Sequence, residues 1–208
     1  MDNFILEIPN AIPNHLCDEI ISRFEKDSRS SPGVINIDND WLCVPDMKES
    51  IALKISAYKE WKDVDLKINK ILNDSLLKYF KFLKHGIGMS IEKQSMHPLL
   101  PYASYEDSHV LPNVSDSGYV VNKIVPGASY KWHYDGGIGT SDFATVIMYL
   151  NTLDYNEGGI TEFINGRKIK PDIGKILIFP SNWSFVHRGQ EVKSKVIKYT
   201  ITTSINLQ

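Results

Sequence analysis

The C-terminal half of the chain is a succession of short segments rich in β-branched and aromatic residues, separated by turn signals. Pro126-Gly127 and Gly136-Gly137 are such signals, and Asn165-Gly166 is typical of a two-residue β-hairpin. Many short strands at regular spacing are typical of a barrel or a two-sheet jelly roll. The strands that we expect are Tyr119–Val125, Ser129–Asp135, Phe143–Asn151, Ile160–Ile164, Lys175–Phe179 and Val196–Ile205.

The N-terminal part has a different pattern, in which apolar residues recur every three or four positions. This spacing predicts helices over residues 14–27 and 65–84. Asp46 followed by Glu49 resembles a capping box and predicts a further helix over residues 46–61. Their apolar faces are expected to pack on the strands that follow. We therefore expect an α+β fold with a mainly β core and the N-terminal helices packed outside it.

Residues 98–118 have no regular pattern and contain several Pro, Ser, Asp and Asn residues. Connections of this length are uncommon in compact domains unless they act as lids or binding loops, and a poorly ordered insertion is the alternative. We expect the loop to be mobile and Tyr102 and Tyr105 to offer aromatic surface to a substrate. The expected organisation is one domain over 1–208, with helical support at 1–97, the long loop at 98–118 and the β core at 119–208.

The composition excludes several classes of function. A net charge of −2 predicts no broad attraction to nucleic acid or to an acidic membrane surface. No signal peptide and no apolar run of about 20 residues is expected to direct the chain into or across a membrane. Two cysteines cannot build a disulfide framework, which favours a reducing, cytoplasmic setting.

A metal site is suggested by His133 and Asp135, which would share one face of a strand because side chains alternate along it. Most isolated His-x-Asp pairs have no such role. Of the six histidines, only His187 also lies in the strand-rich half, downstream of this pair. Two imidazoles and one carboxylate are the facial triad of non-haem Fe(II) oxygenases.

Several motifs in order make this signal specific. His133-Tyr134-Asp135 is followed by Thr145 to Asn151 and by Gly158 to Phe163, and later by Pro171, Gly174, His187, Gly189, Val192 and Lys198 to Thr202. Together, over about 119–205, they resemble the catalytic domain of the prolyl 4-hydroxylase group of 2-oxoglutarate- and Fe(II)-dependent dioxygenases. The resemblance implies a double-stranded β-helix, or jelly roll, and iron bound by His133, Asp135 and His187.

The resemblance also implies Fe(II), 2-oxoglutarate and O₂ as reaction partners, with ascorbate as a candidate reductant. Lys198 occupies the position that pairs with the distal carboxylate of 2-oxoglutarate, and a buried dianion needs a fixed cation opposite it. Tyr149 falls where the family uses a tyrosine hydroxyl to bind the same carboxylate. The chain departs from many relatives at Val125, where they have tyrosine, and at Lys198, where they have arginine. Other residues expected to line the cosubstrate pocket are Thr145, Ile147, Thr161 and Thr200.

The function that the resemblance implies is hydroxylation of a proline residue in a peptide or protein, as in procollagen-proline 4-dioxygenases, with release of succinate and CO₂. Trp183 and Arg188, beside the second histidine, are further candidates for substrate contact. Hydroxylation of a small molecule or of another side chain is an alternative. A jelly-roll binding module without turnover is a third reading, which the intact ligand set and Lys198 disfavour.

Overall fold

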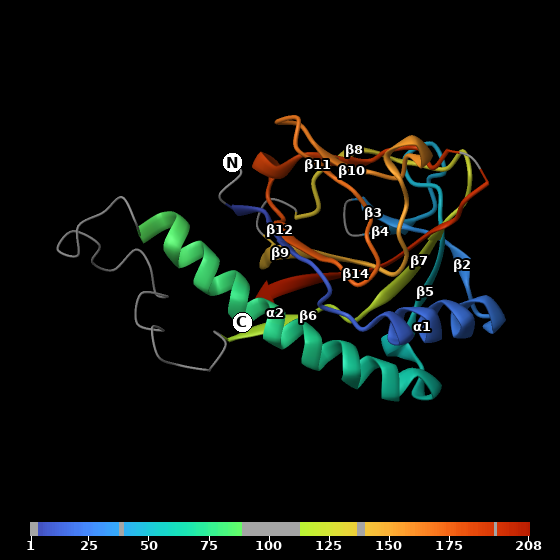
Figure 1. The fold of residues 1–208 in the computed structure, drawn as a ribbon, viewed down its shortest axis with the longest axis horizontal. Coiled ribbons are helices and arrows are strands. Elements are labelled where there is room, and N and C mark those ends of the chain that lie inside the picture. Colours follow the sequence, from blue (N-terminus) through green and yellow to red (C-terminus); the bar gives the residue numbers. More distant parts are fainter. Residues whose placement is uncertain (1–3, 38–39, 89–112, 137–139, 194) are drawn as a thin grey trace.

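Two antiparallel sheets form the body of the protein, and two helices lie along one side of the larger sheet (Figure 1). The computed structural model describes residues 4–37, 40–88, 113–136, 140–193 and 195–208. The order of strands in the larger sheet is β1 (Leu6–Ile8), β12 (Ile176–Pro180), β9 (Asp142–Tyr149), β14 (Lys198–Leu207), β7 (Val120–Ile124), β5 (Ile51–Lys54) and β2 (Ser31–Pro32), with β6 (Val114–Asp116) also paired to β14.

The smaller sheet supplies the second layer of the jelly roll. Its order is β11 (Lys168–Ile169), β10 (Thr161–Phe163), β13 (His187–Gly189) and β8 (Tyr130–His133), and a separate hairpin joins β3 (Ile35–Ile37) to β4 (Asp40–Leu42). Short 3₁₀ turns lie at η2 (Ile55–Ala57), η3 (Lys59–Trp61), η4 (Tyr155–Glu157) and η5 (Trp183–Phe185). The expected jelly roll is thus confirmed, and the predicted strands after residue 118 correspond to β7, β8, β9, β10, β12 and β14.

Side chains along β9 alternate between two separate apolar clusters. Val146 and Met148 belong to the cluster between the larger sheet and the helices. Tyr149 belongs to the cluster between the two sheets, where it is joined by Phe163 of the smaller sheet, and Ile147 packs against that cluster. This alternation follows from the period of two residues in a strand. It leaves the inner face of β9 available to a site between the sheets.

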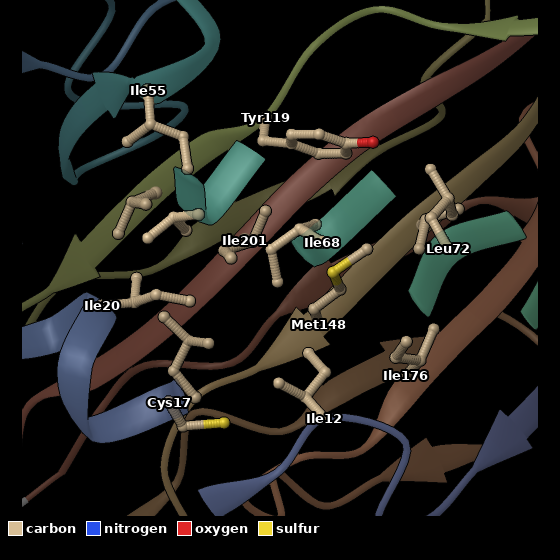
Figure 2. Packing of buried hydrophobic residues seen from close by; sticks show 14 of the residues in the cluster. Ile12, Cys17, Ile20, Ile55, Ile68, Leu72, Tyr119, Met148, Ile176 and Ile201 are labelled. Atoms are coloured by element: carbon tan, nitrogen blue, oxygen red, sulfur yellow. The ribbon is translucent and has the colours of Figure 1, made fainter. Parts of the chain in front are cut away.

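The two helices are α1 (Asn14–Lys26) and α2 (Lys62–Gly88). Figure 2 shows Ile20 of α1 together with Ile68 and Leu72 of α2 against Met148 of the larger sheet. All four side chains are fully or almost fully buried. Each such aliphatic side chain contributes roughly 1.5–3 kcal/mol when it leaves water, so the apolar stripes serve the core. The predicted helices over 14–27 and 65–84 are confirmed.

The helix predicted over residues 46–61 is wrong. Residues 44–48 make only one turn, in which the N–H groups of Met47 and Lys48 both donate to the Val44 carbonyl oxygen. The chain then extends, and β5 pairs with β7. Within β5, Leu53 is buried between half-buried Ala52 and exposed Lys54, because pairing to the sheet imposes a period of two. The N-terminal third is therefore part sheet and not a purely helical support.

Only the last part of the loop predicted over residues 98–118 lies among the described residues. Residues 113–118 lie in the described part, and three of them form β6, so the last part of the predicted loop belongs to the larger sheet. Tyr102 and Tyr105, and the expected mobility of the loop, lie outside the described residues. The division of one domain at residues 97 and 118 stays a prediction.

Candidate metal centre

Three side chains converge at one edge of the smaller sheet. His133 ends β8 and lies directly opposite His187, the first residue of the neighbouring β13. Asp135 lies in a bend two residues after the end of β8, so the strand is shorter than the predicted Ser129–Asp135. One ligand atom from each of the three residues lies within 4.8 Å of the others. The structure thus brings together the histidines and the carboxylate that the sequence pattern selected.

Backbone hydrogen bonds hold both imidazoles in the form that binds a metal. Nδ1 of His133 lies 2.7 Å from the Lys131 carbonyl oxygen, and Nδ1 of His187 lies 3.0 Å from that of Phe185. A carbonyl accepts, so each Nδ1 carries the proton and each Nε2 keeps its lone pair. The Nε2 atoms of His133 and His187 lie 3.3 Å and 3.6 Å from the carboxylate oxygens of Asp135.

The carboxylate of Asp135 is fixed from the larger sheet. The Thr145 hydroxyl of β9 donates to Oδ2 of Asp135 at 2.7 Å and lies 3.0 Å from the Ser181 hydroxyl. Burial alone raises the pKa of Asp135, but His187, His133 and the Thr145 hydroxyl together hold it well below its usual range. Burial lowers the pKa of His187 despite the attraction of Asp135. The set therefore offers one carboxylate and two imidazole nitrogens, which suits a divalent ion.

One side of the three-residue set remains accessible. The side chain of Asp135 is 23% exposed, whereas that of His187 is only 5% exposed. A catalytic metal needs open coordination positions, whereas a structural site is closed by protein ligands. Three ligands on one face leave half of an octahedron for other molecules. The donor set and its open side fit a ferrous ion.

A buried cation lies deeper between the sheets. Lys198 of β14 is 6% exposed, and its Nζ donates to the Gly159 carbonyl oxygen at 2.5 Å. Burial lowers the pKa of Lys198 to about 8, and no carboxylate of the described residues offsets that effect. Gly159 has φ +65°, and a Cβ there would lie 2.9 Å from Leu153 and 3.2 Å from Lys198. Glycine is therefore needed where this loop carbonyl meets the ammonium.

Buried hydroxyl groups lie near Lys198 between the two sheets. Tyr149 and Thr161 share a hydrogen bond of 2.7 Å between their hydroxyl oxygens, and Lys198 Nζ lies 5.5 Å from the centre of the Tyr149 ring. Burial raises the pKa of Tyr149 above its ordinary value, so its hydroxyl keeps the proton that an anion would accept. Thr200 is buried directly opposite Tyr149 in the β9–β14 register. Tyr149, Lys198 and Thr200 of the larger sheet thus lie across from Thr161 of the smaller sheet, with Ile147 packed against the same cluster.

Thr145 was expected to line the cosubstrate pocket, but its hydroxyl makes other contacts. Its hydroxyl is committed to Asp135 and Ser181, which ties the metal ligand to the larger sheet. Sequence reasoning also missed Asn122 of β7, which lies opposite Thr200. Asn122 is 3% exposed and donates to Thr202, while its carbonyl oxygen has no partner among the described residues. An asparagine in the middle of an expected strand was the available signal.

The residues expected to contact substrate are dispersed. Trp183 opens the turn η5 before His187 and is 71% exposed. Arg188 lies on the opposite face of β13 from His187, where it bonds Glu162 and stacks over Trp132 at 4.7 Å. This orientation directs Arg188 away from the metal ligands. Substrate contact by Trp183 and by Arg188 stays a prediction, and the geometry lends support only to Trp183.

Comparison with protein families identifies the domain that carries this site. Residues 119–206 match the family model described as the 2OG-Fe(II) oxygenase superfamily. This span contains the three candidate iron ligands, Lys198 and Tyr149. A comparison with curated protein sequences finds no match.

Solved structures of prolyl hydroxylases share the fold. The viral collagen prolyl hydroxylase of Paramecium bursaria Chlorella virus 1, in its 2-oxoglutarate complex, has 19% identity and a TM-score of 0.60, with 99% of this chain and 96% of that chain covered. A Trichoplax adhaerens prolyl hydroxylase bound to a hypoxia-inducible factor peptide has 16% identity and a TM-score of 0.69, over 98% and 84%. A Pseudomonas putida prolyl-4-hydroxylase has 11% identity and a TM-score of 0.62, over 97% and 92%.

The jelly-roll fold, the match of residues 119–206 to the 2OG-Fe(II) oxygenase superfamily and the converging donor set all agree with one another. In fold and in candidate ligand set the chain is therefore similar to the prolyl hydroxylases among the 2-oxoglutarate-dependent dioxygenases. Within the described residues, no helix is both long enough and apolar enough to cross a membrane.

Replacing Tyr149 with phenylalanine is expected to weaken 2-oxoglutarate binding about two- to tenfold, because one net hydrogen bond is worth ~0.5–1.5 kcal/mol. Isothermal titration of the Mn(II)-loaded protein measures this. Tyr79→Phe is the matched control, since Tyr79 is equally buried but donates to the Phe4 carbonyl. We expect that control to lose some thermal stability and to keep the wild-type affinity. Equal affinities in Tyr149→Phe and wild type would remove Tyr149 from the cosubstrate site.

Proposed function

We propose that this protein is an Fe(II)- and 2-oxoglutarate-dependent dioxygenase that hydroxylates a proline residue in a peptide or protein substrate. In this proposal His133, Asp135 and His187 hold the ferrous ion. When bound, the metal and 2-oxoglutarate activate O₂, so that one oxygen atom enters a substrate C–H bond and the other enters succinate, with release of CO₂. The observation that carries the proposal is that an open two-His, one-carboxylate set on the smaller sheet is combined with a buried lysine of the larger sheet that has no ion-pair partner among the described residues.

The protein's own residues have separate tasks in this scheme. The backbone carbonyls at Lys131 and Phe185 fix the imidazole tautomers, and Thr145 orients Asp135. Lys198 and Tyr149 would bind the distal carboxylate of 2-oxoglutarate, with Thr161, Thr200 and Ile147 lining the same pocket.

A proline-containing substrate is supported by the kind of protein that shares this fold. The Trichoplax adhaerens structure is a prolyl hydroxylase with a peptide bound, and the Chlorella virus structure is a collagen prolyl hydroxylase. Trp183 offers an exposed aromatic surface near the second histidine, and proline rings pack well on aromatic side chains. Ascorbate as the reductant stays a prediction.

The direct test is mass spectrometry on a panel of proline-containing peptides incubated with enzyme, Fe(II), 2-oxoglutarate and O₂. We expect one added oxygen on proline, with succinate formed in proportion. Matched peptides with alanine in place of the target proline should show no added oxygen. Oxygen added to a different side chain, or succinate formation stimulated only by small molecules, would contradict a proline substrate.

Affinity for 2-oxoglutarate is expected to fall at alkaline pH. Lys198, with its pKa lowered by burial to about 8, is mainly protonated below that pH and neutral above it. A bound carboxylate favours the charged form and raises this pKa. Above about pH 8.5 the dissociation constant should therefore rise about tenfold per pH unit until the pKa of the complex is reached. A constant that stays flat up to about pH 10 would contradict a role for Lys198.

A further inference from the structure

Lys48 lies beside the metal centre, although it belongs to the N-terminal part of the chain. The Lys131 N–H donates to the Met47 carbonyl at 2.9 Å, and the Glu49 N–H donates to the Ser129 carbonyl at 3.1 Å. These bonds place residues 47–49 along β8, with Lys48 opposite Tyr130 in an antiparallel bridge. Side chains at such paired positions project to the same side of a sheet.

The side chain of Lys48 reaches toward the iron ligands through one aromatic ring. Its Nζ lies 5.4 Å from the centre of the Tyr130 ring, and that ring stacks on His133 with a centroid separation of 3.5 Å. The ammonium is therefore no farther from the His133 ring centre than these two distances together. Its other contact is a long one, 3.4 Å to the Val34 carbonyl oxygen.

No carboxylate forms an ion pair with Lys48 among the described residues. Burial lowers the pKa of Lys48, and Asp135 raises it only through its more distant charge. Lys175, by contrast, is matched by Glu7 and Asp172. The half-buried Lys48 ammonium thus has donor capacity left over, and an unpaired cation away from water is costly.

The charges of the loaded centre leave Lys48 without compensation. A ferrous ion, the Asp135 carboxylate, the 2-oxoglutarate dianion and the Lys198 ammonium together sum to zero. Lys48 adds one positive charge beside this neutral set. An anion that arrives with the substrate would balance it, and a charge-assisted hydrogen bond is stronger than a neutral one.

We propose that Lys48 binds a carboxylate of the substrate, so that the preferred peptide carries aspartate or glutamate within about three residues of the reacting proline. This inference rests on the proposed function, because it names the class of peptide that the same site accepts. The reach follows from the geometry, since one extended residue spans about 3.3–3.6 Å. Lys48 is a specificity residue in this scheme and takes no part in oxygen chemistry.

The test measures binding of paired peptides that differ only in aspartate or asparagine near the proline, using Mn(II)- and 2-oxoglutarate-loaded protein without O₂. The wild type is expected to bind the aspartate peptide about ten- to a hundredfold more tightly. Lys48→Met should bring this ratio close to one, whereas Lys48→Arg should preserve most of it. Lys78→Met, an exposed lysine on α2, is the matched control and should keep the full ratio.

Two further arms make the result decisive. Thermal melting and 2-oxoglutarate titration show whether Lys48→Met is folded and binds 2-oxoglutarate. If Lys48→Met does not fold, Lys48→Arg still tests the carboxylate preference. Peptide pairs with alanine in place of proline test the carboxylate preference by itself, so failure of proline hydroxylation and failure of this inference are distinguishable. An aspartate preference that persists in Lys48→Met, or its absence in the wild type, would overturn the inference.

Discussion

The Asp135→Ala variant is expected to fold but to lose iron and all turnover. Asp135 is the only anion of the candidate ligand set, and it lies within 3.6 Å of both Nε2 atoms. Without it, two imidazoles remain. Loss even of a residue that only orients a ligand weakens metal binding about 10- to 100-fold, so loss of the ligand itself should exceed that. Metal content after dialysis and succinate formation are the measurements.

His15→Ala is the control for this prediction, because His15 is exposed on α1 and far along the chain from the ligands. It should retain wild-type iron content and turnover. Thr145→Val gives a graded intermediate, since it removes the hydroxyl that orients Asp135 but leaves the carboxylate in place. Full iron content in Asp135→Ala would show that the ion binds elsewhere.

The Lys198→Met variant is expected to keep iron and to lose affinity for 2-oxoglutarate by about ten- to more than a hundredfold. The reason is that charge-assisted hydrogen bonds are worth ~1.5–3 kcal/mol each, and a buried carboxylate without its cation is costly. Replacing the ammonium with a thioether also removes the burial cost of a charge, so the free protein should be no less stable. Titration calorimetry and thermal melting measure the two quantities.

Lys175→Met is the matched control for the loss of a buried lysine. Lys175 is 9% exposed but is paired with Glu7 and Asp172, so its replacement should lower stability and leave 2-oxoglutarate affinity unchanged. Lys198→Arg should restore part of the affinity, because guanidinium retains the charge but must fit beside Gly159. Wild-type affinity in Lys198→Met would assign the carboxylate to another cation.

The fold of the C-terminal half was predictable because its strands repeat with regular turns, and six of them lie where the pattern indicated. The N-terminal strands were not. In β5, four residues are too few to separate a period of two from a helical one, and the partner strand β7 lies almost seventy residues downstream. The Asp46 and Glu49 pattern, typical of a helix start, produced one turn, because Glu49 finds its backbone partner at Ser129.

The ligand set was predictable from residue type and order, since few histidines were available and the motifs followed in sequence. The residues that surround the ligand set were not predictable from the sequence. The contact between Thr145 and Asp135 depends on how the two sheets face each other. The place of Lys48 depends on an isolated bridge between distant segments, and that of Asn122 on the register of β7 with β14. No local pattern contains such long-range pairings.

The alternation along β9 separates two kinds of mutational risk. A codon change at Val146 or Met148 alters packing against the helices and therefore how much of the protein is folded at a given temperature. A change at Thr145 or Tyr149 alters a direct contact with the candidate metal ligand Asp135 or with Thr161 between the sheets. Neighbouring positions on one strand are thus exposed to different selection. Substitutions on the helix-facing side of β9 can change thermal tolerance, and substitutions on its inner side can change cosubstrate affinity.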